Sequence, residues 1–194
     1  RNETHIAGSH LLDEESGDYN DSYIRKYLGN DNTLVIKCVK RQQGLMVLPR
    51  NPKSINSLRD IVSKDADNGI IRYVNRQKGS GTRILLDYLL KKENIPVSNI
   101  YGYDREEFTH LSVAALIASG SADAGMGIYS AAKAYGLEFI PVCQEEYDFI
   151  LPSNYGELES VKCFIEILKS EEFKKALNEM GGYLLENTGE VYTI

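Results

Sequence analysis

The feature that most constrains this chain is the stretch Asn75–Arg83, which reads Asn-Arg-Gln-Lys-Gly-Ser-Gly-Thr-Arg. An apolar run at 69–74 precedes it and predicts a short buried strand, and a helical run at 84–92 follows it. We therefore expect the stretch to form the turn between a strand and a helix. Gly79 and Gly81 allow a tight turn and a close approach of the backbone to a ligand, because they have no Cβ.

The same stretch has the composition of a small-anion site. Ser80 or Thr82 can cap the new helix, whose first turn carries unpaired N–H groups at the positive end of the macrodipole. Arg76, Lys78 and Arg83 add positive charge, and no acidic residue lies within the stretch. A capped turn without any ligand would explain the glycines and hydroxyls equally well, so the basic residues favour the anion. The dipole contributes only ~0.3–1 kcal/mol per charge, so useful affinity requires a second wall.

Composition and charge narrow the classes of function. The 194 residues are 42% hydrophobic and 26% charged, which is typical of one large globular domain or two small lobes. The net charge of −6 argues against broad contact with nucleic acid and favours a focused basic pocket for a small anionic ligand. No segment is long enough to span a membrane. The chain has no G-x-S-x-G motif and no P-loop, so we expect a binding domain rather than an enzyme.

The cysteines and the first residue of the chain bear on the cellular compartment of the protein. The three cysteines have no C-x-x-C spacing, which favours free buried thiols in a reducing compartment, and we expect a cytoplasmic protein. The chain starts at Arg1 rather than Met, so we expect sequence upstream, and a signal peptide there would make the protein extracytoplasmic.

Predicted strands and helices alternate along most of the chain. Strands are expected at 34–39, 44–48, 69–74, 100–103, 122–128, 139–142 and 147–151, and helices at 23–28, 57–62, 84–92, 110–119, 130–135, 158–168 and 173–180. This alternation predicts an α/β fold with mostly parallel sheets. The alternation breaks near 34–48 and 139–151, where one strand follows another without a long helix between them. Such segments suit crossings between two lobes. We therefore expect lobe I at 1–52 and 144–194, and lobe II, with the anion loop, at 53–143.

Six segments in one order resemble a known family. They are Ala7-Gly-Ser-His-Leu-Leu-Asp13, Glu15-Ser-Gly-Asp-Tyr-Asn20, Arg41-Gln-Gln-Gly-Leu-Met46, Asn51-Pro52, the Asn75–Arg83 stretch and Ser119-Gly-Ser-Ala-Asp-Ala-Gly-Met-Gly127. Together they cover essentially the whole chain. They resemble the periplasmic-binding-protein-like domain, often labelled LysR substrate-binding, that is attached to MoeA-type molybdopterin-biosynthesis enzymes and to small helix-turn-helix regulators.

The resemblance implies a two-lobed type II periplasmic-binding-protein-like fold with two crossing strands as the hinge. Family members usually begin with a further strand–helix–strand segment, so the N-terminal part of lobe I is expected to be missing. That segment contains a Gly/Ser-rich loop that would form the second wall of an anion site. Its absence would leave an unpaired sheet edge, which a second copy could cover as a homodimer. The loop at 79–83 is also similar to the Ser-Gly-Thr loop of phosphate- and tungstate-binding proteins.

The candidate ligand-binding residues fall into three groups. The loop supplies the first five, the segment after the N-terminus supplies two donors of an opposing wall, and the expected hinge and return strand supply the rest. They are Ser80, Gly81, Thr82, Arg83 and Arg76; Ser9 and His10; and Arg41, Gln43 and Tyr147. Arg41 and Gln43 would equally suit a polar strand edge, and Tyr147 could pack. His10 lies near Asp13, but their spacing fits a metal site poorly, so no metal is expected.

The first functional hypothesis is a sensor or substrate-delivery domain that binds a small oxyanion. Molybdate or tungstate is implied by the resemblance, which links the domain to molybdenum cofactor biosynthesis or its regulation; no other cofactor is expected. A fused enzyme or helix-turn-helix domain would be the partner. One alternative is a transcriptional effector domain that binds an organic anion such as a pterin phosphate in a cleft lined by Tyr101, Tyr103 and Tyr147. Another is an accessory domain of a molybdopterin-biosynthesis enzyme. The residues do not rank phosphate, sulfate and molybdate.

Overall fold

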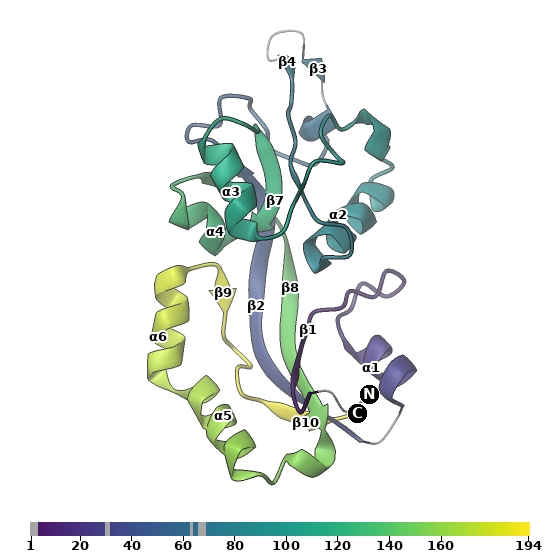
Figure 1. The fold of residues 1–194 in the computed structure, drawn as a ribbon, viewed down its shortest axis with the longest axis vertical. Coiled ribbons are helices and arrows are strands. Elements are labelled where there is room, and N and C mark those ends of the chain that lie inside the picture. Colours follow the sequence, from purple (N-terminus) through teal and green to yellow (C-terminus); the bar gives the residue numbers. More distant parts are fainter. Residues whose placement is uncertain (1–3, 30–31, 63, 66–68) are drawn as a thin grey trace. The chain divides into compact units, whose positions relative to one another are not determined.

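The computed structural model describes residues 4–29, 32–62, 64–65 and 69–194 (Figure 1). The chain forms two compact units: unit 1 is Arg1–Arg41 with Glu145–Ile194, and unit 2 is Gln42–Gln144. The chain enters unit 2 within strand β2 (Thr33–Val47) and leaves it within strand β8 (Glu138–Pro152). The sequence predicted lobe boundaries directly after residues 52 and 143. The first division lies earlier because 43–47 pair with a strand of unit 2.

Strands β2 and β8 are each one continuous strand of 15 residues, where the sequence predicted two shorter strands in each place. The polar residues at 40–43 and 144–146, which lay between the predicted strands, are part of these continuous strands. Gly44 in β2 has a packing reason, because a Cβ there would overlap the carbonyl oxygen of Ile140. Both strands belong to a six-stranded sheet.

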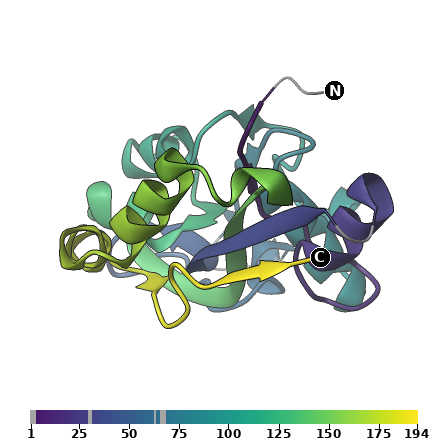
Figure 2. The same ribbon diagram turned by 90° about the horizontal axis from the view of Figure 1, so that it is seen from below.

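Unit 1 is built on the outer parts of these two strands. Strand β1 (Ala7–Ser9) pairs antiparallel with β8, and β9 (Tyr183–Leu184) and β10 (Val191–Thr193) pair antiparallel with β2. Figure 2 shows β10 in yellow running alongside β2.

Three helices cover the sheet of unit 1. Helix α5 (Glu159–Lys169) packs Leu168 against Ile36 and Leu151, and α6 (Glu171–Met180) follows it. Helix α1 (Asp21–Leu28) buries Ile24 in a second cluster beside β2. A single 3₁₀ turn, Ser153–Tyr155, lies between β8 and α5.

Unit 2 contains three strands that run in one direction. Strands β5 (Asn75–Arg76) and β6 (Glu106–Glu107) are parallel, and a parallel bridge joins Tyr73 to Ala124 at the start of β7 (Ala124–Ile128). A helix follows each strand: α2 (Gly81–Lys92), α3 (His110–Ala118) and α4 (Tyr129–Ala134). In Figure 1, α3 and α4 lie on one side of β7 and α2 on the other. The carboxyl ends of these strands are where α/β folds usually place a ligand.

Two local predictions in unit 2 differ from the structure. The expected strand at 69–74 is divided: β4 (Gly69–Ile70) pairs with β3 (Lys64–Asp65), and the buried part joins β7 through the bridge. The expected strand at 100–103 is a turn, because Gly102 has a φ of +90° and the strand forms later, at β6. Two 3₁₀ turns, Asp60–Val62 and Val97–Asn99, complete the unit.

The expectation of mostly parallel sheets is wrong for the six-stranded sheet. Strand β2 pairs antiparallel with β7, β9 and β10, and β8 pairs antiparallel with β1. In the described ranges, the parallel pairings are those of β5 with β6 and of Tyr73 with Ala124, between segments that precede helices, since each helix returns the chain to the start of the next strand. In the described part of the chain, no helix is long and apolar enough to cross a membrane.

Candidate functional site

The loop 77–80 joins β5 to α2, as the sequence predicted, and its geometry follows from single residues. Gly79 has a φ of +88°, a conformation that a side chain would strain. Ser80 is extended (φ −73°, ψ 147°) and is the N-cap of α2, because its side-chain oxygen accepts a hydrogen bond from Arg83 N at 3.3 Å. The helix therefore starts at Gly81, earlier than the predicted residue 84.

The first turn of α2 has donors that the protein does not use. Ser80 N donates to Gln77 O at 3.1 Å and Arg83 N donates to the cap. Over the residues that the structure describes, the N–H groups of Gly81 and Thr82 donate to no protein acceptor. The Thr82 side chain is only 3% exposed, and its Oγ1 accepts from Gln43 Nε2 at 3.1 Å. This helix terminus is therefore an electropositive end with open donors.

The two arginines of the loop bind protein groups. Arg83 is buried, with Nη1 3.2 Å from Glu106 Oε1 and Nε 3.2 Å from Asp87 Oδ1. Its guanidinium lies over the Tyr103 ring, 4.0 Å from the centroid, and the Tyr103 hydroxyl donates to Asp87. These contacts tie α2 to β6. Arg83 therefore has a structural role, since its guanidinium links α2 to β6.

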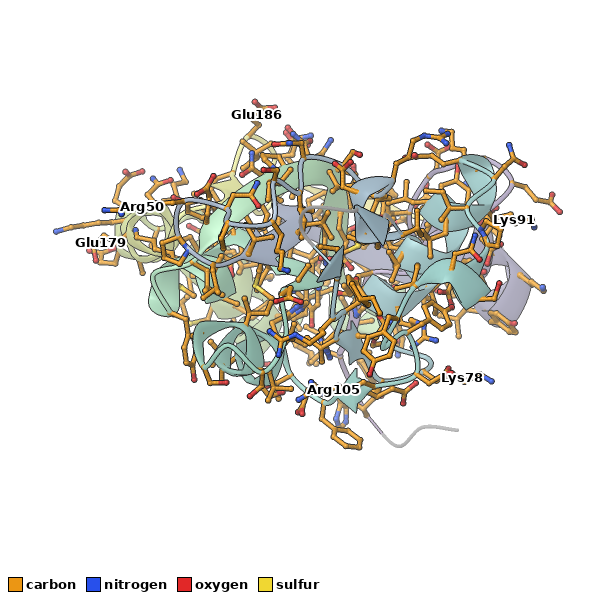
Figure 3. The ribbon with its side chains drawn as sticks, turned by 90° about the horizontal axis from the view of Figure 1, so that it is seen from above. Arg50, Lys78, Lys91, Arg105, Glu179 and Glu186 are labelled. Carbon is orange, nitrogen blue, oxygen red and sulfur yellow. The ribbon has the colours of Figure 1, made fainter. Side chains whose placement is uncertain are left out.

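The Arg76 side chain also binds protein groups, whereas the Lys78 side chain lies on the surface. Arg76 Nη2 donates to the Phe108 carbonyl at 3.0 Å and its Nε to Gln77 Oε1 at 3.2 Å. The Lys78 side chain is exposed and projects away from the ribbon, while its backbone N donates to Glu106 (Figure 3). The positive character of this site therefore comes chiefly from the helix terminus, and the arginines fix its shape.

Two further residues of unit 2 lie at the same edge of the parallel strands. Gln43 is fully buried and stands opposite Ile128, the last residue of β7, in the β2–β7 ladder. His110 is the first residue of α3, and a Cβ on Gly127 would lie 3.4 Å from its Nδ1. Thr109 caps α3 through a capping box with Ser112. The structure thus joins Thr82 and Gln43 through a hydrogen bond and places His110 beside β7.

The other predicted residues form a second group, in unit 1. Pairing of β1 with β8 places Ser9 opposite Asp148, next to His10. The His10 and Tyr147 rings are stacked, with centroids 5.5 Å apart and planes 16° apart. The Arg41 guanidinium lies 5.1 Å from the centroid of the Tyr147 ring. The structure therefore brings His10, Arg41 and Tyr147 together.

Glu145 is the centre of this second group, and the sequence reading missed it. Its side chain is 1% exposed, with Oε2 2.7 Å from Arg41 Nε and Oε1 2.9 Å from His10 Nδ1. The carboxylate neutralises Arg41, and the 2.7 Å contact is made by the guanidinium Nε. A sequence signal existed: Glu145, Tyr147 and Phe149 alternate along β8, and a charge within such a series indicates a buried partner.

A series of buried hydrogen bonds fixes the Ser9 side chain. Its Oγ donates to Asn20 Oδ1 at 2.8 Å, and Asn20 Nδ2 donates to Asp148 Oδ2 at 2.8 Å. Lys37 Nζ lies 3.2 Å from the same Asp148 oxygen. Burial raises the pKa of Asp148, against the opposing effect of Lys37. The Ser9 hydroxyl therefore donates within the protein, to the chain that joins β1 to β8.

A small cavity of about 40 Å³ lies in unit 1 between β2 and the segment 184–188. Cys38 and Asp148 line it, and burial raises the pKa of the Cys38 thiol to about 11, so the thiol is protonated at neutral pH. None of the three cysteines forms a disulfide; Cys38 is buried, Cys143 is half-buried and Cys163 is exposed. Within the described ranges, no three His, Cys, Asp or Glu side chains are placed to hold a metal ion.

These features define a two-unit α/β domain in which a helix terminus with open N–H donors lies at the carboxyl end of β5. The chain belongs to the PBP superfamily, because the family model described as "PBP superfamily domain" matches residues 1–169. This result confirms the periplasmic-binding-protein-like part of the sequence resemblance, and it agrees with a small-ligand-binding role.

Relatives and solved structures agree with this assignment. The chain is 39% identical over 187 residues to the uncharacterized protein YvgK of Bacillus subtilis (strain 168), covering 96% of this chain and 58% of YvgK. It therefore spans somewhat more than half the length of that relative.

Among solved structures, the ancestral amino acid-binding protein AncCDT-1, a precursor of cyclohexadienyl dehydratase, has a TM-score of 0.57 at 16% identity, covering 92% of this chain and 70% of that one. An ABC-type phosphate transport receptor from Vibrio cholerae has a TM-score of 0.55 at 17% identity, covering 93% and 79%. At such identities the likeness shows the fold alone, and it confirms the predicted mixed α/β fold of the type II periplasmic-binding-protein kind.

Proposed function

We propose that this domain binds a small, fully ionised oxyanion at the N-terminus of α2, with molybdate and tungstate as the first candidates. The observation that carries the proposal is the set of unused donors there, the N–H groups of Gly81 and Thr82 beside the buried Thr82 hydroxyl. Backbone N–H groups at a helix terminus suit an anion because they combine hydrogen bonding with the dipole.

The choice of anion and the cellular role come from the resemblance of the six sequence segments. In this proposal the domain acts in the cytoplasm as a sensor or delivery module for molybdenum cofactor biosynthesis or its regulation. A fused MoeA-type enzyme or helix-turn-helix domain would be its partner. The organic-anion alternative has less support, because the Tyr103 hydroxyl already donates to Asp87 and Tyr101 is 62% exposed.

The assembly proposal concerns the edge of the sheet in unit 1. In the six-stranded sheet of the described residues, β1 is the strand at one edge, and its neighbour in the strand order is β8. A second copy could pair with that edge, and sedimentation that shows a monomer at high concentration would exclude it.

The variant Gly81→Pro tests the anion site selectively. Proline suits the first helical position, and the extended Ser80 before it has the conformation that precedes proline. The change removes one N–H donor and leaves the helix intact. A hydrogen bond to a charged group contributes about 1.5–3 kcal/mol. We therefore expect affinity for molybdate or tungstate to fall about tenfold or more.

Isothermal titration with molybdate, tungstate, sulfate and phosphate gives the measurement, on this chain and on the full-length natural protein. The matched control is Glu171→Pro, at the first position of α6, whose cap Ser170 is also extended (φ −63°, ψ 149°). That control should bind as the wild type does. The proposal fails if the wild type binds none of the four anions, or if Gly81→Pro binds as tightly as the wild type.

A further inference from the structure

One oxygen of the buried Asp148 carboxylate lies outside the hydrogen-bond network of unit 1. Asp148 belongs to β8 and is 1% exposed. Its Oδ2 accepts from Asn20 Nδ2 at 2.8 Å and from Lys37 Nζ at 3.2 Å. Over the residues that the structure describes, its Oδ1 accepts no hydrogen bond. A buried carboxylate oxygen without a donor is costly, so a ligand or an ordered water is expected beside Oδ1.

Asp148 lines the cavity of about 40 Å³ in unit 1, and this cavity has room for such a ligand. One water molecule needs about 10–15 Å³ by the same measure, so a ligand of a few heavy atoms fits. The cavity lies where β2 passes from one partner strand to the next. Strand β9 pairs with Lys40 and Arg41 of β2, and β10 pairs with residues 34–36 (Figure 1).

The Thr188 hydroxyl is a second acceptor in the wall of this cavity. Thr188 Oγ1 donates its hydrogen to the carbonyl oxygen of Cys38 at 2.6 Å. In the described part of the chain the hydroxyl makes no other hydrogen bond, so its lone pairs are available to accept. The cavity therefore offers two acceptors, Asp148 Oδ1 and Thr188 Oγ1, to a ligand that donates.

The charge of the cavity wall favours a cation over water. Lys37 Nζ lies 2.8 Å from Glu146 Oε2, and Lys40 Nζ lies 3.0 Å from Glu146 Oε1. Three carboxylates line the cavity with these two lysines, so one negative charge is in excess; they are Glu146, Asp148 and Glu186. Glu186 extends outward at the surface (Figure 3). Water would satisfy the acceptors, whereas a cation that donates would also balance the charge.

We propose that this cavity binds a small primary ammonium compound, such as ammonium or methylammonium, whose N–H groups donate to Asp148 Oδ1 and Thr188 Oγ1. Cys38 and Leu184 supply apolar wall atoms for a methyl group. The site lies wholly in unit 1, and the inference is independent of the proposed anion site at the start of α2.

A metal ion suits this cavity less well than an ammonium group. The Lys37 ammonium already lies 3.2 Å from Asp148 Oδ2 and would repel a metal ion on the same carboxylate. Hard cations such as Ca²⁺ take about six to eight oxygen ligands. Within the described ranges, no three His, Cys, Asp or Glu side chains are placed to hold a metal ion. An ammonium group needs only acceptors for its N–H groups, and the cavity provides them.

Saturation-transfer NMR on the full-length natural protein tests the site, with methylammonium as the ligand observed. We expect saturable binding with a dissociation constant on the order of 10 mM, because a ligand of two heavy atoms makes few contacts. Ammonium chloride should displace methylammonium. Sodium chloride and tetramethylammonium chloride, whose cations donate no hydrogen bond, should displace it at least tenfold less effectively. Methanol, which has the same size without the charge, should bind at least tenfold more weakly.

Asp148→Asn tests the carboxylate oxygen directly. The asparagine oxygen can still accept from Asn20 and Lys37, and its NH₂ group then takes the place of Oδ1 and faces the ligand as a donor. We expect the affinity for methylammonium to fall at least fivefold. The matched control is Asp123→Asn, because Asp123 is also buried but both of its oxygens accept from Arg72. That control should bind methylammonium as the wild type does.

The second acceptor has its own test. Thr188→Val removes the hydroxyl and should lower the affinity for methylammonium at least twofold. Wild-type affinity in both Thr188→Val and Asp148→Asn would overturn the inference, and so would equal losses in Asp148→Asn and Asp123→Asn.

The wild type alone also decides the question if a variant does not fold. The absence of a saturable methylammonium signal would mean that the cavity holds water only, and would overturn the inference. Displacement by sodium or tetramethylammonium as effective as that by ammonium would overturn it too, because the site would then attract any cation. Molybdate should not displace methylammonium, so failure of the anion site and failure of this site are distinguishable.

Discussion

Glu145→Gln is the change for which the structure gives the clearest estimate of stability. The carboxylate is 1% exposed, and its Oε2 lies 2.7 Å from Nε of Arg41, whose side chain is 16% exposed. At that distance the attraction of two unit charges is about 6 kcal/mol for an effective dielectric constant of about 20. Removing both charges from water offsets much of it. Glutamine keeps the shape and one acceptor oxygen, but leaves the half-buried Arg41 guanidinium without this counter-charge.

We expect Glu145→Gln to lower the free energy of unfolding by about 2 kcal/mol, near the lower end of the range for hydrogen bonds to charged groups. The corresponding fall in melting temperature is about 4–8 °C for a chain of this size. Urea unfolding followed by circular dichroism measures the first quantity, and calorimetry the second. If the loss comes from the pair with Arg41, Arg41→Gln should lower the free energy of unfolding by less in the Glu145→Gln background than in the wild type.

The matched control is Glu157→Gln, which makes the same change of charge on the surface. Glu157 is 92% exposed, and its Oε2 lies 3.1 Å from Nζ of Lys162. Its replacement should change stability by less than about 0.5 kcal/mol. Equal effects of the two substitutions would refute the reasoning, because they would show that burial does not strengthen the Glu145 pair.

Two other predictions concern titratable groups. Cys163 is exposed and Cys38 is buried with its pKa raised to about 11, so a thiol reagent at pH 7 should label Cys163 and reach Cys38 only after denaturation; equally fast labelling of both would contradict the burial of Cys38. Burial alone would raise the pKa of Asp123, but hydrogen bonds from the side chain and backbone of Arg72 lower it overall. Because the folded-state pKa is depressed, this stabilisation is complete above about pH 4 and is lost as the pH falls through the folded-state pKa. Asp123→Asn should therefore be less stable than the wild type near neutral pH, and the difference should shrink in acid; a difference that is constant with pH in urea unfolding would refute it.

The local pattern around the loop could be read from the sequence with good accuracy. Ser80 or Thr82 was expected as the cap of the helix after the loop, and Ser80 caps it. The small residues at 122–128 were expected as a strand, and β7 forms there. These features depend on neighbours in the chain, since a cap, a turn and an apolar run act within a few residues.

Strand pairing between distant segments could not be predicted from local patterns. The sequence predicted shorter strands in place of β2 and β8, and a strand at 100–103 where a turn forms. Strand continuity depends on partners far along the chain, such as the pairing of Gln43 with Ile128. Such partners are not visible in local propensity.

The sequence alone determined that a Gly-Ser-Gly-Thr loop starts a helix and supplies open N–H groups, because helix geometry leaves those donors unpaired wherever the helix begins. Only the tertiary structure decided which side chains remain for a ligand. It placed the buried Arg83 against the partly exposed carboxylates of Asp87 and Glu106, and Arg41 against the buried Glu145, so these two arginines are paired within the protein. A buried charge requires a partner, and the fold supplies Glu106 to Arg83 and Glu145 to Arg41 from distant parts of the chain.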